Sequence, residues 1–125
     1  MREIKFRAWD KSRGQYFTNP KWVEFRVNAD GALVAINYAI GGKEQKLAVE
    51  QFTGLKDKNG VDIYEGDILA YGENVPERVA IFENGSFRLL DDDNHANQVL
   101  VVDTARRLEI IGNIHQNPEL LEESK

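Results

Sequence analysis

The sequence contains no cysteine among its 125 residues, which excludes disulfide bonds, thiolate metal sites and cysteine nucleophiles. No apolar run approaches the roughly 20 residues that a membrane-spanning helix needs. The first residues, MREIKFRAWD, alternate charged with apolar side chains and lack the apolar core of a signal peptide. We therefore expect a cytoplasmic protein with no membrane partner.

Side chains suited to catalysis are scarce. His95 and His115 are the only histidines, and Ser12, Ser86 and Ser124 are the only serines. No GxSxG nucleophile elbow is present. The central glycines are spaced by turns and followed by a strand, not by a helix, so a phosphate-binding loop is absent as well. These absences predict that the protein is not an enzyme and holds no cofactor.

One acidic run could hold a hard cation through its oxygens, namely Asp91-Asp92-Asp93-Asn94-His95. It fails the EF-hand pattern, because Ala96 stands where the loop needs glycine and Val102 stands where it needs an acid. We interpret the run as a solvated acidic loop and predict no metal site.

Positive charge is also in short supply. The net charge of −5 argues against general affinity for DNA or RNA, which requires cations that neutralise phosphates. The distribution is uneven, with a net +4 over residues 1–26 and −9 over residues 27–125. Two solvated faces of opposite sign would explain this. The alternative is head-to-tail self-association or a docked partner.

The chain is rich in residues that dictate backbone shape, above all in residues 51–69, QFTGLKDKNGVDIYEGDIL. Gly54, Gly60 and Gly66 are spaced six apart, and Asp57-Lys58-Asn59-Gly60 is typical of a tight turn. Strand-forming residues separate these turns. The stretch therefore specifies shape more than chemistry, within a protein that we expect to be mainly β.

A meander is expected in the N-terminal part, after a strand at residues 3–9 that forms a hairpin with a short strand near residues 16–18. The dipeptides Asp30-Gly31 and Gly41-Gly42 are favoured in two-residue hairpin turns. They predict antiparallel strands at about 22–28, 32–40 and 43–50.

Counting outward from the two turns fixes the register of this meander. Phe25 should lie opposite Ile36, and Ile36 opposite Leu47, with all three side chains buried on one face.

A third turn, Asn84-Gly85, predicts a hairpin over residues 78–91. Counting outward pairs Phe82 with Phe87 and Ala80 with Leu89. At the open end the same count places Arg78 opposite Asp91.

The remaining C-terminal elements are short. Residues 99–102 and 108–111 fit buried strands, although a helix through residues 101–108 is an open alternative. Asn117-Pro118-Glu119 predicts the start of a C-terminal helix, with a capping asparagine and proline at the first helical position.

Three motifs in one order carry a family resemblance: MREIKFRAWD at the start, TGLKDKNGVDIYEGDI in the middle and IGNIHQNPELL near the end. Together they resemble the YopX family, small proteins encoded mainly by bacteriophages and prophages. The resemblance implies a phage setting and an SH3-like β-barrel in the C-terminal part. It carries no activity and no catalytic residue.

The expected architecture is thus an antiparallel N-terminal β subdomain over residues 1–50 and a C-terminal SH3-like barrel subdomain over residues 51–125, which includes the terminal helix. The expected function is a protein-interaction module that binds a host or phage protein, or a second copy of itself. Five residues are candidates for the partner contact: Trp9, Trp22, Tyr64, Glu65 and Asp67. For Asp67 the alternative is a carboxylate that accepts backbone N–H groups at a bend made by Gly66.

The rival function is a small-barrel protein that binds nucleic acid. Only the basic residues Arg2, Lys5, Arg7, Lys11 and Arg13 favour it. Because the protein as a whole is acidic, we expect no such partner.

Overall fold

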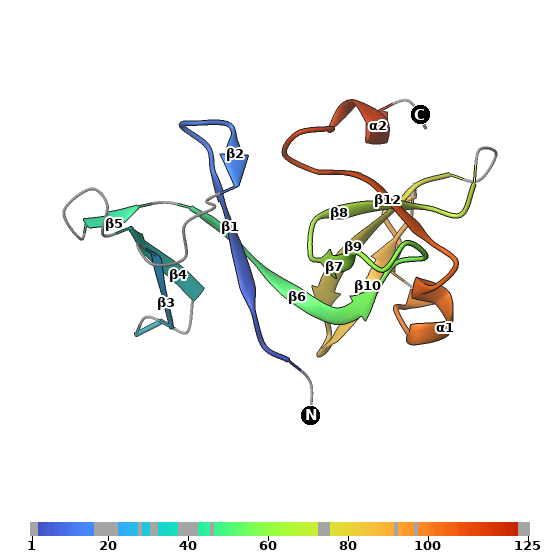
Figure 1. Ribbon diagram of the computed structural model, residues 1–125, viewed down its shortest axis with the longest axis horizontal. Coiled ribbons are helices and arrows are strands. Elements are labelled where there is room, and N and C mark those ends of the chain that lie inside the picture. The colour runs from blue at the N-terminus through green and yellow to red at the C-terminus, as the bar shows by residue number, and fades with distance from the viewer. Residues whose placement is uncertain are drawn as a thin grey trace. The chain divides into compact units, whose positions relative to one another are not determined.

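The described part of the chain forms antiparallel β-sheets and two short helices (Figure 1). This computed structural model describes residues 3–16, 23–27, 29–30, 33–37, 43–45, 47–72, 76–91, 93–96 and 98–122. The chain divides into two compact units. The N-terminal unit is Lys5–Gln51, and the C-terminal unit is Phe52–Lys125 together with Met1–Ile4. The expectation of a mainly β, antiparallel protein is confirmed.

Two antiparallel arrangements make up the N-terminal unit. Its strands are β1 (Phe6–Asp10), β2 (Gln15–Tyr16), β3 (Val23–Val27), β4 (Leu33–Asn37), β5 (Lys43–Gln45) and the first part of β6 (Ala48–Lys56). Strand β1 pairs with β2 and with β6, whereas β3, β4 and β5 form a sheet of their own.

The expected hairpin between β1 and β2 is confirmed, with Trp9 opposite Tyr16. Its loop is closed by the buried carboxylate of Asp10, which accepts hydrogen bonds from the Ser12 hydroxyl and from the backbone N–H groups of Ser12 and Arg13. The Ser12 hydroxyl contributes most to lowering the pKa of Asp10, and the Arg13 charge adds to this. The loop therefore stabilises itself through one local carboxylate.

The strand order β3-β4-β5 confirms a meander, but its predicted register is wrong. Phe25 lies opposite Ala35, one residue away from the expected Ile36, and the described pair nearest the turn is Val27–Leu33. An odd number of sequence positions separates these two residues, whereas a two-residue turn leaves an even number between paired residues. The connection is therefore longer than a two-residue turn. The pairs are Val23–Asn37, Glu24–Ile36, Phe25–Ala35, Arg26–Val34 and Val27–Leu33.

The third predicted strand, 43–50, is divided between two sheets. Ile36 lies opposite Glu44 instead of Leu47, a shift of three residues. Strand β5 ends at Gln45, and Val49 lies opposite Ala8 of β1, not on the meander. The prediction failed because β1 provides a competing strand neighbour that counting from a local turn cannot reveal.

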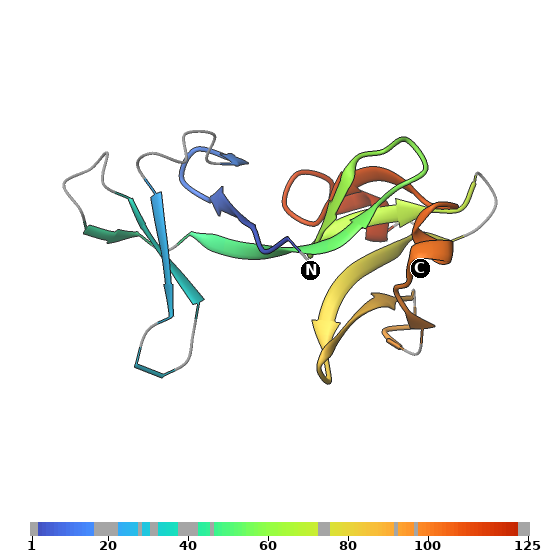
Figure 2. The same cartoon turned by 60° about the horizontal axis from the view of Figure 1, so that its bottom comes forward.

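The C-terminal unit is built around a five-stranded sheet of order β11-β10-β9-β8-β12. The sheet curls into a half-barrel (Figure 2), in the part of the chain where the family resemblance implied an SH3-like β-barrel. Its elements are β7 (Asp62–Tyr64), β8 (Asp67–Ala70), β9 (Arg78–Glu83), β10 (Ser86–Leu90), β11 (Gln98–Val99), α1 (Val102–Ala105), β12 (Glu109–Asn113) and α2 (Glu119–Glu122).

The β9–β10 hairpin confirms the predicted register. Phe82 pairs with Phe87, and their rings meet edge to face with centroids 5.0 Å apart. Ala80 pairs with Leu89, as expected. Gly85 has φ +80°, a conformation that glycine adopts without strain and that a two-residue turn of this kind requires.

Residues 98–113 combine the two alternatives that the sequence left open. A two-residue strand, β11, is followed after Leu100 and Val101 by the single-turn helix α1, and β12 then pairs with β8. The predicted strand at 108–111 is confirmed by β12, and the predicted C-terminal helix by α2. Helix α2 begins at Glu119, one residue after Pro118, and the Asn117 side-chain oxygen accepts the backbone N–H of Asn113.

The core of the C-terminal unit lies inside the curled sheet. It contains the fully buried side chains of Ile63, Leu69, Ala80, Leu89 and Leu108. Within the parts of the chain that the structure describes, no helix has both the length and the apolar character needed to cross a membrane.

Candidate functional site

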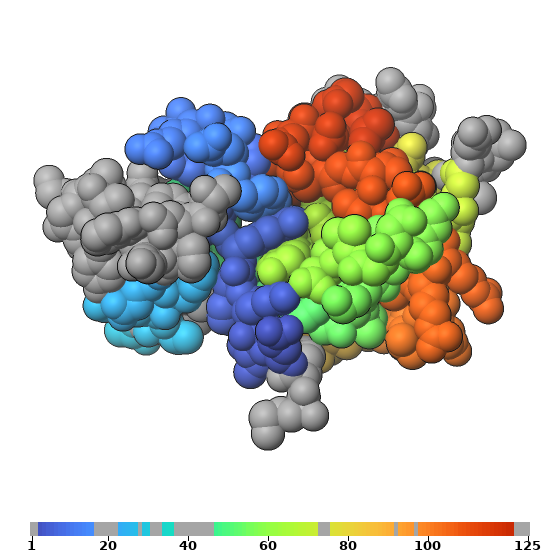
Figure 3. Space-filling model, in the orientation of Figure 1, coloured from blue at the N-terminus to red at the C-terminus, as the bar shows by residue number. Residues whose placement is uncertain are grey.

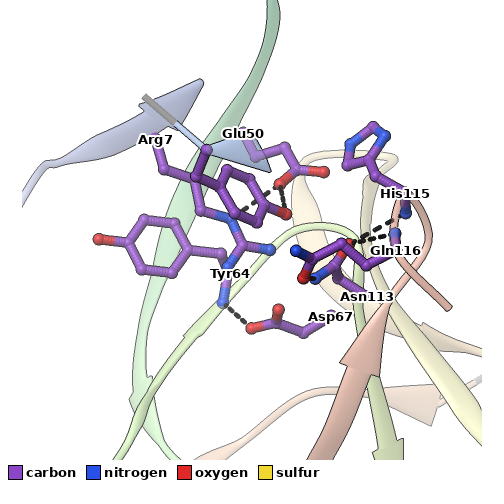
Figure 4. A network of polar contacts seen from close by, with 8 residues as sticks. Arg7, Glu50, Tyr64, Asp67, Asn113, His115 and Gln116 are labelled. Atoms are coloured by element: carbon purple, nitrogen blue, oxygen red, sulfur yellow. Dashed lines mark hydrogen bonds and ion pairs between the residues drawn. The ribbon is translucent and has the colours of Figure 1, made fainter. Parts of the chain in front are cut away.

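The bend between β7 and β8 carries three of the five predicted contact residues, of which Figure 4 labels Tyr64 and Asp67. Gly66 has φ +86°, and the Asp67 carboxylate accepts a hydrogen bond of 2.8 Å from the backbone N–H of Tyr64. The Tyr64 ring packs against Phe52, with centroids 5.5 Å apart. The alternative role that the sequence offered for Asp67, a carboxylate that fastens its own bend, is confirmed.

A second polar turn adjoins this bend, because Asn113 of β12 pairs with Asp67 of β8. The Asn113 side-chain oxygen accepts backbone N–H groups of His115 and Gln116 at 3.0 and 2.9 Å, and its amide nitrogen donates to the Gln116 side chain (Figure 4). Further, the N–H of Ile114 donates to the carbonyl of Gly66. These bonds fix loop geometry, and His115 takes part through its backbone.

Asp57 is a buried carboxylate of the central stretch with a long-range hydrogen-bond partner. Its two oxygens accept backbone N–H groups of Asn59 and Val61 in its own turn and of Ile110 on β12, at 2.8 to 3.0 Å. Burial by itself raises the pKa of Asp57, but these three N–H groups outweigh it and hold the pKa below the ordinary aspartate value. Asp57 therefore joins the turn to the sheet as a charged structural group.

The N-terminal unit contains a separate polar cluster across three strands, of which Figure 4 labels Arg7 and Glu50. Arg7 and Tyr16 both donate to the same oxygen of Glu50 at 2.8 Å, and the Arg7 guanidinium lies 4.2 Å from the centre of the Tyr16 ring. Glu50 is buried, and these two donors compensate its charge. This cluster joins β1, β2 and β6.

The predicted contact residues differ sharply in exposure. Trp9 is 6% exposed and Asp67 is 2% exposed, so neither presents much side-chain surface to a partner. Tyr64 and Glu65 are half-buried. Trp22 lies outside the residues that the structure describes.

The acidic run at residues 91–95 was interpreted as a solvated loop. Its described residues form a turn that is held by hydrogen bonds to the carboxylate of its own first residue. Asp91 accepts the backbone N–H groups of Asp93 and His95, and the latter bond contributes most to lowering the pKa of Asp91. One ligand atom each from Asp91, Asp93 and His95 lies within 4.8 Å of the others. Asp93 and His95 are exposed. Arg78 contributes a favourable charge near Asp91, in keeping with their predicted positions at the open end of the hairpin.

An exposed apolar segment was missed by the sequence analysis, which expected residues 99–102 to be buried. Val99, Val101 and Val102 are 42%, 48% and 51% exposed, whereas Leu100 between them is buried. Figure 3 shows the side chains of this part of the chain, in orange, at the surface of the C-terminal unit. We call Val99, Val101 and Val102 the valine segment.

A signal for this arrangement was present in the sequence. Asp103 and Thr104 interrupt the apolar run directly after the valine segment. Ala105 and Leu108 then continue the buried side begun by Leu100. An apolar run that ends in polar residues at a single helical turn sits at the edge of a core, not in its centre.

The comparisons with known proteins agree with this fold. A family model described as YopX protein matches residues 5–122. The chain belongs to the YopX family. The match covers both compact units, so the family assignment extends over nearly the whole described chain.

Two solved structures resemble this YopX-family chain. Protein EF1440 from Enterococcus faecalis has a TM-score of 0.71 and 27% sequence identity, covering 97% of this chain and 99% of that one. Protein yopX from Bacillus subtilis has a TM-score of 0.60 and 21% identity, covering 97% of each, and this likeness concerns the fold alone. A search of curated protein sequences gave no significant match.

Proposed function

We propose that this YopX-family protein is a cytoplasmic, phage- or prophage-type interaction module without enzymatic activity, and that it binds a host or phage protein through the valine segment. The observation that carries the proposal is the exposure of three neighbouring valines at an edge of the five-stranded sheet. Clustered exposed apolar side chains are a common mark of protein-binding surfaces.

The buried polar groups support a role in binding rather than catalysis. The carboxylates of Asp10, Asp57 and Asp67 each accept backbone N–H groups of a turn beside them. Carboxylates that are hydrogen-bonded to backbone N–H groups in this way stabilise the conformation of a turn. A general acid or base would instead need to reach a substrate proton.

The partner surface combines apolar side chains with backbone. Strand β11 ends the five-stranded sheet and carries Val99, while Val101 precedes α1 and Val102 is the first residue of α1. A partner with an apolar patch, or one that adds an extended segment beside β11, would bury these valines. Either mode makes the valine segment the energetic centre of the contact.

Nucleic acid is the less favoured partner, because the described arginines of the basic N-terminal stretch pair with carboxylates. Arg7 pairs with Glu50 at 2.8 Å, Arg13 with Asp10 at 3.7 Å and Arg26 with Glu24 at 2.5 Å. Paired guanidinium groups contribute less to the release of phosphate counterions.

The central test is affinity capture from phage-infected host cells, using the intact protein and a variant in which Val99, Val101 and Val102 are all replaced by threonine. Threonine keeps the shape and strand preference of valine but adds a hydroxyl, so the fold should survive. The matched control is Val61→Thr, at a valine that is 51% exposed on the tight turn. We expect a stoichiometric protein partner that the triple variant loses and the control retains. Equal capture by all three would refute the proposed surface.

The nucleic-acid alternative is tested by fluorescence anisotropy with labelled duplex and single-stranded oligonucleotides over a salt series. We expect no binding to random duplex DNA tighter than tens of micromolar at about 0.15 M salt. Sub-micromolar binding that weakens steeply with salt and is lost in Arg7→Glu would overturn the protein-module proposal.

A further inference from the structure

Strand β3 lies at the end of the sheet β3-β4-β5, with β4 as its one strand neighbour among the described residues. A strand at the end of a sheet presents backbone donors and acceptors along its outer side, which can pair with another strand. Glu24, Arg26 and Val27 are exposed, and Val23 and Phe25 are half-buried. The strand therefore has both the position and the exposure for strand addition.

The sequence of β3, VEFRV, is complementary to itself when two copies run antiparallel. If the two-fold axis passes through Phe25, Phe25 faces Phe25 of the second copy, and Glu24 faces Arg26 of the second copy. Val23 then faces Val27 of the second copy. Every opposed pair is thus either apolar with apolar or acid with base.

Neighbouring registers lack this complementarity. Sliding one copy by two residues keeps the faces of the strand but places either Glu24 opposite Glu24 or Arg26 opposite Arg26. Like charges directly opposite each other in a sheet are destabilising, whereas opposite charges are favourable. A slide by one residue instead places charged residues opposite apolar ones. Charge alone therefore selects the register centred on Phe25.

The same register covers the most exposed apolar side chain on this strand. Val27 is 70% exposed. It shares a face with Val23 and Phe25, because side chains alternate along a strand. Contact with Val23 of the second copy would remove Val27 from water on that face. The four charges would lie on the opposite face, in two pairs with no net charge.

From these observations we propose that two copies of this chain associate through β3 into a two-fold symmetric dimer. The two three-stranded sheets join into one six-stranded sheet of order β5-β4-β3-β3-β4-β5. The interface is isologous, since the same residues contribute from each copy. This dimer is independent of the partner proposed above, which binds the C-terminal unit.

Within one copy, Glu24 and Arg26 already form an ion pair along the strand, at 2.5 Å between a carboxylate oxygen and Nε. Dimerisation would place Glu24 opposite Arg26 of the other copy and Arg26 opposite Glu24 of the other copy. The four charges would then form one cluster. Because the pair is exposed, its rearrangement costs little.

The test uses the intact protein and sedimentation equilibrium over a concentration series that reaches the millimolar range. The intact protein should show a reversible monomer–dimer equilibrium. Glu24→Arg and Arg26→Glu should each weaken the dimer by at least roughly tenfold, because each places like charges opposite one another twice. The double variant Glu24→Arg/Arg26→Glu restores opposed charges and should restore the dimer.

An equimolar mixture of the two single variants distinguishes a specific loss of association from a loss of folding. Each single variant lacks the ion pair within its own strand, yet the two are complementary to each other at both positions. We therefore expect the mixture to form a heterodimer where neither variant forms a homodimer. Lys58→Glu, at the exposed ion pair with Glu109 in the C-terminal unit, is the control and should leave the equilibrium unchanged.

Three results would overturn the proposal. The first is an intact protein that stays monomeric throughout the series. The second is a dimer that both single variants form as well as the intact protein. The third is a mixture that dimerises no better than its components. Circular dichroism melts of each variant confirm that the compared proteins are folded.

Discussion

Two hairpins of this protein were predicted by the same argument, and only one has the expected register. In the β9–β10 hairpin, the count outward from Asn84-Gly85 agrees with the structure at each predicted pair within the two strands. In the β3–β4 hairpin, the count outward from Asp30-Gly31 is wrong by one residue. The two dipeptides have equal standing as turn signals, so the difference arises in the strands.

The strands of the β9–β10 hairpin are fixed by burial. Ala80 and Leu89 are 0% and 1% exposed, and Val79 is buried on the other face. A slip by one residue would expose a filled core. In β3, by contrast, Val27 is 70% exposed and Phe25 is half-buried. Ala35 and Ile36 of the partner strand β4 are buried, but little apolar surface of β3 itself depends on the register, so a longer loop is tolerated.

The largest expected effect is at the buried hairpin. Leu89→Ala should lower the free energy of unfolding by about 2–5 kcal/mol, because it removes a fully buried side chain and leaves a cavity. Urea unfolding followed by circular dichroism measures this loss. A loss below about 1 kcal/mol would show that burial does not fix the β9–β10 register.

Asp57 in the C-terminal unit and Asp10 in the N-terminal unit test whether a carboxylate with a long-range partner contributes more stability than one with local partners. Asp57→Ala should cost about 2–4 kcal/mol, because it leaves buried N–H groups in the turn and on β12 without their acceptor. Asp10→Ala should cost less, since its partners lie within one loop. Urea unfolding of both variants at neutral pH measures the two losses in the free energy of unfolding. Equal losses would contradict the expected order.

The pH dependence of the Asp57 contribution has a defined sign. Its pKa is lowered in the folded protein, so the carboxylate contributes fully above the ordinary aspartate value of 3.8. The contribution is lost as the pH falls through the folded pKa. The stability difference between the intact protein and Asp57→Asn should therefore shrink in acid, and unfolding curves from neutral to acidic pH measure it. A constant difference would contradict the role of the charge.

Gly85→Val tests the turn itself. The φ of +80° is strained for a β-branched residue, although an added side chain would meet no neighbouring atom within 4 Å. We expect a loss of about 1–3 kcal/mol that comes from backbone strain alone. Gly85→Asn should recover much of it, since asparagine tolerates this conformation better. Thermal melts compare the two variants, and identical melting temperatures would refute the turn type.

The smallest expected effect is at the exposed meander. Phe25→Ala removes a half-buried ring that packs against Phe6 with centroids 5.4 Å apart. We expect a loss of about 1–2 kcal/mol, well below the 3–5 kcal/mol of a fully buried phenylalanine. Both tryptophans, Trp9 and Trp22, belong to the N-terminal unit, so tryptophan fluorescence reports its unfolding. A loss as large as that of Leu89→Ala would remove the contrast between the hairpins.

The candidate site was predictable only in part. The role of Asp67 as a carboxylate that closes its own bend follows from local sequence, because its partner is three residues away. The valine segment was not predicted, because exposure depends on which strand lies beside β11. Trp9 was a candidate contact on the charged face of its strand, yet it is buried and packs edge to face on Tyr16.

By itself, the sequence determined the features whose partners are close along the chain. The mainly β composition, the Asn84-Gly85 hairpin and the helix start at Asn117-Pro118-Glu119 follow from local backbone preferences and from the spacing of apolar residues. The family motifs are also legible without any structure. In each case a few neighbouring residues hold all the information.

Only the tertiary structure decided the pairings between distant segments. Residues 43–56 are divided between two sheets because Ala8 of β1 competes for Val49, and Asp57 bonds to Ile110, which lies 53 positions further along the chain. Such contacts depend on which segments pack together once loop-closure entropy has been overcome. A turn motif specifies the direction of the chain and leaves the choice of neighbour to the whole fold.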